Sequence, residues 1–351
     1  MDLWLLFFIM VGVLIPTIGK TIFKHEFTRA EWVVVIVGNT IICTVVYIGG
    51  AYMSLQDTEI WNGHVTHKHS EKVRCEHSYQ CNCVSVSCGK DCTTRVCQTC
   101  YRHSYDVDWN VKTTAGDFTV DREDSQGLKQ PKDWTNILVG EPVALPKSFT
   151  NYIKAAPDSL FNFKIEHEYE LPDYPEVHDY IRINRVIDTI SNSGLDVTMM
   201  NQMLSKELAI LGPAKESNVV VVLTDKDEEY ARALESHWLG GKKNDTVVVI
   251  GLNGQDVSWT KVFGFTKNSV SNISIQNNIK ELKEFDSRKI VQIISKGIDE
   301  HFIRRSMEEF EYLKDHHEPP LWVILLGLFF SIIGTSLATY LLSNNSEREW
   351  R

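Results

Sequence analysis

The chain has 351 residues, of which 43% are hydrophobic and 23% are charged, so it is neither a disordered nor a fibrous protein. Its formal net charge of −10 argues against a nucleic-acid partner. Apolar residues concentrate near the two ends, and seven of the eight cysteines lie between Cys75 and Cys100. This distribution disfavours an ordinary cytosolic enzyme.

Three apolar segments are predicted to cross a lipid bilayer as transmembrane helices. Residues 32–53 and 320–342 have the length of about 20 residues that a membrane-spanning helix needs. Residues 1–19 contain a shorter apolar run, for which a cleaved signal peptide is the alternative, although the run lacks a basic start and an A-x-A cleavage site. A short basic loop at 20–31 and a tail at 343–351 complete the membrane region.

The charges of the short loops set the predicted orientation. The loop at 20–31 carries Lys20, Lys24 and Arg29, and positively charged loops tend to stay on the cytoplasmic side. Residues 54–319, between the second and third spans, are then extracytoplasmic. We therefore expect an integral membrane protein with one large external body.

Small residues mark two faces of the last span. Gly334 and Ala338 are four positions apart, as are Ser331 and Thr335, and this spacing lets helices approach closely. The Gly334/Ala338 face predicts a contact with a second copy of the chain, and hence a homo-oligomer. Packing against the other spans, or a face that simply lies in lipid, are the alternatives.

Residues 54–109 form a His/Cys-rich module that is too polar to fold by hydrophobic burial alone, so it needs disulfides or a metal. Two close cysteine pairs flank the 13 residues 84–96, a spacing typical of a zinc knuckle, and each pair has a histidine nearby. Structural zinc is the first hypothesis. The predicted ligands are Cys81, Cys83, Cys97, Cys100, His77, His103 and Cys75.

Disulfides are the main alternative for this module, because an extracytoplasmic compartment oxidises thiols. Seven cysteines leave one unpaired, however. A mixed solution also fits, with the two close pairs on zinc and Cys88 joined to Cys92. A redox-active pair at Cys97 and Cys100 is a third hypothesis.

Residues 110–179 are predicted to be a strand-rich connecting region. The alternation of Tyr105–Val111 and of Phe118–Val120 indicates strands. Four aspartates near these strands match no calcium-binding loop, so we expect them to be surface carboxylates. They are Asp106, Asp108, Asp117 and Asp121.

Residues 180–314 alternate between helical and strand patterns, which predicts an α/β fold with a small mixed sheet covered by helices. The runs 219–223 and 246–251 are typical of buried strands. Asn253-Gly254 predicts a tight turn before a third strand at 257–263. The expected helices cover 197–211, ended by Gly212-Pro213, and 227–238, 277–284 and 287–312.

Several motifs in this region occur in the order and spacing of the TPM domain, a family named for a thylakoid lumen protein, a photosystem repair protein and a nematode receptor modulator. The motifs are Arg185-Val-Ile-Asp188, Val219–Thr224, Glu229-Tyr-Ala231, Trp238–Asp245, Val247–Ile250, Phe263-Gly264 and Lys296-Gly-Ile298. Residues 180–314 thus resemble a TPM domain. The three-span arrangement is similar to that of membrane proteins of bacteria and their phages.

The resemblance implies a location outside the cytosol and a membrane helix after the domain. It also implies weak phosphatase activity or calcium binding at acidic residues, which on this chain are Asp188, Asp225, Asp227 and Asp245. The chain departs from the family pattern at Thr266, where a glycine is expected, and it has no arginine between Asn253 and Lys261. These departures disfavour an inherited phosphatase site.

The functional expectation is a non-catalytic membrane protein whose external body binds or modulates another membrane or envelope protein. The chain is rich in apolar segments that can anchor it in a membrane and in cysteines that can crosslink it, and it lacks the common catalytic motifs. A weak metal-dependent phosphatase or hydrolase of TPM type is the alternative.

Overall fold

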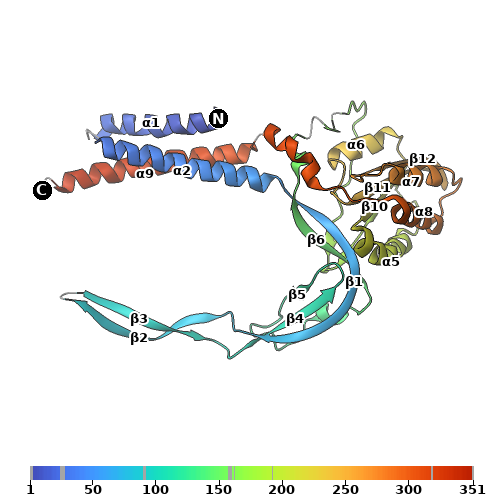
Figure 1. Cartoon of the computed structure of the whole chain (residues 1–351), viewed down its shortest axis with the longest axis horizontal. Coiled ribbons are helices and arrows are strands. Elements are labelled where there is room, and N and C mark those ends of the chain that lie inside the picture. Colours follow the sequence, from blue (N-terminus) through green and yellow to red (C-terminus); the bar gives the residue numbers. More distant parts are fainter. Residues whose placement is uncertain are drawn as a thin grey trace. The chain divides into compact units, whose positions relative to one another are not determined.

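The computed structural model describes residues 3–23, 28–89, 92–156, 160–161, 163–191, 193–317 and 319–349. The chain divides into two compact units, shown in ribbon form in Figure 1. The first unit contains residues 1–57, 149–160 and 306–351, and the second contains residues 58–148 and 161–305.

Three long helices of the first unit contact one another: α1 (Leu3–Phe23), α2 (Arg29–Ser54) and α9 (Leu321–Glu349). Helix α2 and residues 321–344 of α9 are long and apolar enough to cross a membrane. These helices confirm the two candidate spans predicted at 32–53 and 320–342. The apolar part of α1 is shorter, so a third span stays a prediction.

The helices of this unit approach one another at glycines. A Cβ atom at Gly12 would lie 2.6 Å from the side-chain nitrogen of Asn39, and one at Gly327 would lie 2.7 Å from the ring of Phe8. The side chain of Asn39 also donates a hydrogen bond of 3.0 Å to the backbone oxygen of Phe8. An unpaired amide is costly among apolar helices, so this bond favours one register of α1 on α2.

The buried face of α9 carries a small polar residue at every fourth position. These residues are Ser331, Thr335, Thr339 and Ser343. The hydroxyls of Thr335 and Thr339 donate to carbonyl oxygens one turn earlier in the same helix. Gly334 has open space beside its Cα, and the homo-oligomer contact predicted at Gly334 and Ala338 stays a prediction.

Two short 3-10 helices complete the first unit. They are η1 (Tyr152–Ala155) and η2 (Met307–His316), and they contact each other. Next to η1, the backbone nitrogen of Asn151 donates to the carbonyl of Leu55, directly after α2. The chain that leaves α2 is therefore fixed by hydrogen bonds within its own unit.

The second unit begins with a four-stranded sheet in the order β5-β4-β1-β6. Its strands are β1 (Gln56–Val73), β4 (Asp106–Thr113), β5 (Phe118–Val120) and β6 (Pro142–Thr150). Strand β4 pairs antiparallel with both β1 and β5, which confirms the two strands predicted near 105–111 and 118–120. Val65, Val111 and Val143 pack together in a small core that also includes residues near α3 (Lys132–Asn136).

A long hairpin formed by β2 (Ser78–Gly89) and β3 (Cys92–Tyr101) is inserted between β1 and β4. Among the described strands, these two pair only with each other. Their apolar side chains are exposed, with Val84 at 59% and Val96 at 51%. A lone two-stranded hairpin is at best marginally stable in water, so its stability must come from another source.

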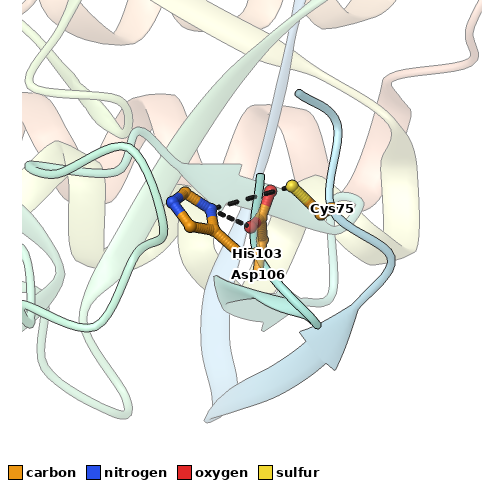
Figure 2. Close-up of side chains that lie close together, drawn as sticks. All are labelled: Cys75, His103 and Asp106. Carbon is orange, nitrogen blue, oxygen red and sulfur yellow. Dashed lines mark hydrogen bonds and ion pairs between the residues drawn. The ribbon is translucent and has the colours of Figure 1, made fainter. Parts of the chain in front are cut away.

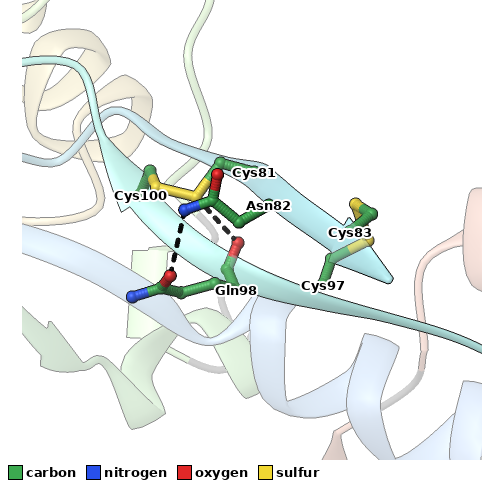
Figure 3. Close-up of a disulfide and its surroundings, with 6 residues drawn as sticks. All are labelled: Cys81, Asn82, Cys83, Cys97, Gln98 and Cys100. Atoms are coloured by element: carbon green, nitrogen blue, oxygen red, sulfur yellow. Dashed lines mark hydrogen bonds between the residues drawn. A yellow bond between two sulfur atoms is a disulfide. The ribbon is translucent and has the colours of Figure 1, made fainter. Parts of the chain in front are cut away.

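Two disulfides cross this hairpin and supply that stability (Figure 3). They join Cys81 to Cys100 and Cys83 to Cys97. A crosslink reduces the conformational freedom of the unfolded hairpin. The structure therefore contains a disulfide-stapled β module in place of the predicted zinc knuckle.

The remainder of the second unit is an α/β domain with a four-stranded mixed sheet in the order β12-β11-β10-β9. Its strands are β9 (Val186–Asp188), β10 (Asn218–Thr224), β11 (Asp245–Asn253) and β12 (Asp256–Phe263). Strands β9, β10 and β11 are parallel, and β12 returns antiparallel to β11 after the Asn253-Gly254 turn. A further pair, β7 (Val177–His178) and β8 (Arg182–Ile183), precedes the sheet. The predicted mixed sheet is confirmed.

Helices cover both faces of this sheet. Alternate residues of β10 face opposite sides, so Val219 and Val221 contact α5 (Val197–Lys215), α7 (Val270–Lys280) and α8 (Ser287–His301) in one core. Val220 and Val222 face a second core with α6 (Glu229–His237). The continuous valine run therefore reflects a strand buried on both faces.

The predicted bounds of three helices are wrong. Helix α5 continues past Gly212-Pro213 to Lys215, where Glu216 adopts a left-handed conformation. Gly212 is needed for packing instead, because its Cβ would lie 2.4 Å from the carbonyl oxygen of Asn62. Helix α7 spans Val270–Lys280 rather than 277–284, and α8 ends at His301 rather than at 312.

The first prediction concerns the stapled hairpin. Replacing Cys83 and Cys97 with serine removes a crosslink between residues 14 positions apart, which should destabilise the hairpin by about 3 kcal/mol. We expect trypsin to cleave the full-length protein after the exposed Arg95 at least about tenfold faster, because the hairpin opens more often. Limited proteolysis without reductant measures this rate.

The control for this experiment is Cys43→Ser, which removes a free cysteine outside the hairpin. Cleavage of this variant should match the wild type. Equal cleavage of the wild type and of the double variant would show that the Cys83–Cys97 crosslink does not hold the hairpin together.

Candidate metal centre

The four cysteines first predicted to bind zinc are joined to one another in two disulfides. A β-bulge in β2 explains part of this pairing, because Asn82, with a φ of 47°, and Cys83 stand opposite the single residue Cys97. The side chain of Asn82 donates a hydrogen bond of 3.2 Å to Gln98 across the bulge (Figure 3). The zinc ligand set is therefore corrected at Cys81, Cys83, Cys97 and Cys100.

Two other cysteines of the module bear on this correction. Cys88 is also disulfide-bonded, whereas the side chain of Cys92 lies outside the described residues, so the predicted Cys88–Cys92 pair cannot be compared with the structure. Cys75 is a free, buried thiol. Among the described cysteines of residues 54–109, Cys75 is therefore the one whose sulfur could bind a metal.

Cys75, His103 and Asp106 converge where the hairpin joins the four-stranded sheet (Figure 2). The Cys75 Sγ lies 3.7 Å from His103 Nδ1, and the same nitrogen lies 3.0 Å from Asp106 Oδ1. All three potential ligand atoms lie within 4.8 Å of one another. Cys75 and Asp106 are buried, and the His103 side chain is only 16% exposed.

The carboxylate of Asp106 is fixed from its far side. Its Oδ2 accepts hydrogen bonds from the backbone nitrogen of Glu76, at 3.0 Å, and from the Arg122 guanidinium, at 3.1 Å. Arg122 is itself held by Asp108 at 2.5 Å. Oδ1 remains directed toward the other two members of the cluster.

These contacts also set the charge of Asp106. Burial by itself raises the pKa of this carboxyl group, but the hydrogen bonds from Glu76, His103 and Cys75 and the charge of Arg122 together lower the pKa to about 2. Asp106 is therefore an ionised carboxylate at neutral pH.

The geometry differs from that of a cysteine nucleophile with a histidine base. In a catalytic triad the nucleophile and the carboxylate contact opposite ring nitrogens, whereas Cys75 and Asp106 both face Nδ1 of His103. Cys75 is also only 3% exposed, so a substrate could not reach its sulfur. Sulfur, imidazole nitrogen and carboxylate oxygen converging on one point are instead a set of donors suited to zinc.

The sequence identified part of this cluster. Cys75 and His103 were among the predicted ligands and are brought together. His77 is not, since it is exposed and its ring centroid lies 6.3 Å from that of His103. Asp106 was predicted to be a surface carboxylate and is buried instead. The available signal was its position three residues after His103, at the start of an alternating strand.

The four aspartates implied by the TPM resemblance lie at both ends of the α/β sheet. Asp188 ends β9, and Asp225 and Asp227 follow β10, so these three lie near the carboxyl ends of the parallel strands. Asp245 begins β11, opposite Asn218, about 20 Å away along the strands. The structure therefore does not bring all four into one site.

Three of these aspartates are engaged by neighbouring groups. Asp188 accepts from Ser193, Asp225 pairs with Lys226, and Asp227 accepts from Tyr169. Thr266, which departs from the family pattern, exchanges hydrogen bonds with the backbone of Ile303. Its hydroxyl thus anchors the chain that leaves α8.

Asp245 belongs to a buried polar network centred on Arg185. The guanidinium of Arg185 donates to Asn218 at 2.7 Å and to Asn62 at 2.9 Å, and it also donates to Ser205. Asn218 in turn donates to Asp245 at 2.8 Å. Burial raises the pKa of Asp245 to about 6, against the lowering effect of these hydrogen bonds, and burial lowers the pKa of Arg185 to about 10.

Comparisons with known proteins give no relative for this chain. No protein-family model, no curated protein and no solved structure matches it. The TPM resemblance therefore stays a prediction.

The second prediction concerns the pH dependence caused by Asp245. Because its pKa is about 6 in the folded protein and near the ordinary value of 3.8 when exposed, the folded state binds more protons between these two values. The protonated Asp245 side chain therefore stabilises the folded state at low pH. This contribution to the unfolding free energy is lost as pH rises through about 6.

The Asp245→Asn variant cannot titrate at this position, so it lacks this dependence. The wild type should lose on the order of 2 kcal/mol of unfolding free energy relative to the variant between about pH 4 and pH 7. Urea unfolding of the full-length protein in detergent measures the difference. Asp225→Asn, at an exposed position, is the control. A wild-type-to-variant difference that stays constant with pH would contradict the assignment.

Proposed function

We propose that this chain is a non-catalytic, membrane-anchored binding protein that contacts another membrane or envelope protein through its β2–β3 hairpin. The observation that carries the proposal is that two disulfides crosslink this hairpin while its apolar side chains are exposed. Exposed apolar groups held in a fixed frame are a feature of interaction sites.

Anchoring in the membrane rests on α2 and α9. We extend it to a third span, α1, since its 21 residues would reach about 31 Å as a helix. The hydrogen bond from Asn39 to Phe8 supports this extension. A helix that stays in the mature protein is stabilised by such a specific contact, whereas a cleaved signal peptide is not. Loop charges and disulfides together support a location of residues 54–319 outside the cytosol.

The hairpin has two chemically different faces. Val84 lies opposite Val96 in the register, and Val86 follows on the same face of β2. The alternate residue Ser85 lies opposite Arg95 on the other face. A partner with an apolar surface would therefore contact the valine face, and the serine face would stay in water.

The third prediction tests this difference between faces. A photoreactive residue is placed at Val84 or at Ser85 in the full-length protein, in the membranes of the cells that make it. We expect a protein adduct from position 84 that is several times more abundant than from position 85. Val96→Asp should abolish that adduct, because it introduces a charge opposite Val84.

Folding of each variant is checked by its resistance to trypsin without reductant. The matched control is Thr93→Asp, which adds the same charge opposite Ser87 on the other face, and it should leave the adduct unchanged. Adducts of equal yield from both positions, or none from position 84, would refute binding through the valine face.

A further inference from the structure

We propose that Cys75, His103 and Asp106 bind a zinc ion that fastens the base of the β2–β3 hairpin to the four-stranded sheet. This proposal rests on the cluster alone and does not depend on the partner of the hairpin. The ligand set differs from the zinc knuckle expected from cysteine spacing, since it uses one thiolate, one imidazole and one carboxylate.

The distances within the cluster are close to those of a tetrahedral zinc site. Zinc binds sulfur at about 2.3 Å and nitrogen or oxygen at about 2.0 Å, so neighbouring ligand atoms are about 3.3–3.5 Å apart. The separations are 3.7 Å from Cys75 to His103 and 3.0 Å from His103 to Asp106, and Cys75 lies within 4.8 Å of Asp106. Shifts of a few tenths of an ångström along these contacts would accommodate the ion.

The hydrogen bonds around the cluster also favour a metal. His103 Nδ1 faces both a thiol and a carboxylate, and the side chains of His103 and Cys75 both hydrogen-bond Asp106. The same sulfur, nitrogen and oxygen atoms carry lone pairs that an ion between them could accept. The backbone of Glu76 and the guanidinium of Arg122 hold Asp106 from behind. Groups of this kind orient metal ligands in known sites.

Charge balance is compatible with this site. Zinc would bind Cys75 as a thiolate beside the Asp106 carboxylate, and such buried negative charges need compensation. A divalent cation neutralises both. Arg122 cannot do so alone, because it also pairs with Asp108 and Glu76.

The cysteine usage of the hairpin provides an independent argument. Five cysteines of this segment are in disulfides, namely Cys81, Cys83, Cys88, Cys97 and Cys100, whereas Cys75 is free. A free thiol is unusual in the oxidising compartment proposed for this region. Zinc would keep Cys75 as a bound thiolate and protect it from oxidation.

The position of the cluster implies a structural role for the ion. Cys75 lies just before β2, and His103 and Asp106 lie just after β3. Zinc would therefore tie together the two chain segments through which the hairpin leaves and re-enters the sheet. The disulfides make the hairpin rigid, and the ion would fix its connection to the rest of the second unit.

The experiment measures zinc in the full-length protein, purified in detergent without reductant and dialysed to remove loosely bound metal. We expect about one zinc ion per chain by mass spectrometry of the metal. Cys75→Ser and Asp106→Asn should each reduce the zinc content at least about tenfold. Cys43→Ser removes the other cysteine that is free among the described side chains, and it should leave the zinc content unchanged.

A second measurement does not depend on variants that fold. Cobalt substituted for zinc in the wild type should give the absorption band of a thiolate-to-cobalt bond, and the band should be missing after Cys75→Ser. Wild-type protein that binds neither zinc nor cobalt would overturn the proposal and leave a hydrogen-bonded cluster. Zinc that persists in both ligand variants would overturn it as well, because the ion would then be bound elsewhere.

Discussion

The guanidinium of Arg185 connects the long strand β1 to the α/β sheet, and its burial constrains every segment around it. Transfer of such a charge out of water costs several kcal/mol unless it is fully hydrogen-bonded. Here the acceptors are neutral oxygens of Asn62, Asn218, Ser205 and the Val219 backbone, and Asp245 acts one step away through Asn218. Loss of the Asn62 side-chain oxygen would remove the acceptor of Arg185 Nη2, and a buried N–H group left unpaired costs about 1–3 kcal/mol.

The same strand is held at neighbouring positions. Both carboxylate oxygens of Glu59 accept from one guanidinium nitrogen of Arg304, at 2.6 and 2.8 Å, and Asn244 donates to the backbone oxygen of Ile60 at 2.8 Å. The first half of β1 is thus bound to the α/β domain, while its second half pairs with β4. For this reason the cysteine-rich module and the α/β domain belong to one compact unit, although the sequence shows a change of composition between them.

Patterns that depend on local sequence were sufficient to predict much of this fold. The valine runs of β10 and β11, the Asn253-Gly254 turn and the two apolar helices α2 and α9 follow from periodicity and turn chemistry. The stop expected at Gly212 was wrong because a residue far away in sequence, Asn62, determines why glycine is needed there. A glycine required for packing and one required for a helix end cannot be distinguished without knowing what lies opposite.

The candidate site was less predictable for the same reason. Two close cysteine pairs fit a zinc knuckle or a pair of disulfides equally well until the register of the hairpin is known, and the bulge at Asn82 sets that register. His103 and Asp106 can be recognised as ligands only once the pairing of β1 with β4 is known, because that pairing brings Cys75 beside them. Knowledge of strand pairing would have been needed to choose the ligands.

Whether a cysteine is disulfide-bonded or free depends on whether other side chains can bury its sulfur atom. No other described strand pairs with the hairpin and its valines are exposed, so covalent bonds replace apolar contacts there. At its base, the first four-stranded sheet does provide cover, and Cys75 and Asp106 are buried there. A hairpin that exposes Val84 and Val96 does not use them to pack against its own chain. Its rigidity then comes from the crosslinks along its length, and the hydrogen-bonded cluster of Cys75, His103 and Asp106 lies at its base. Both leave the valine face exposed.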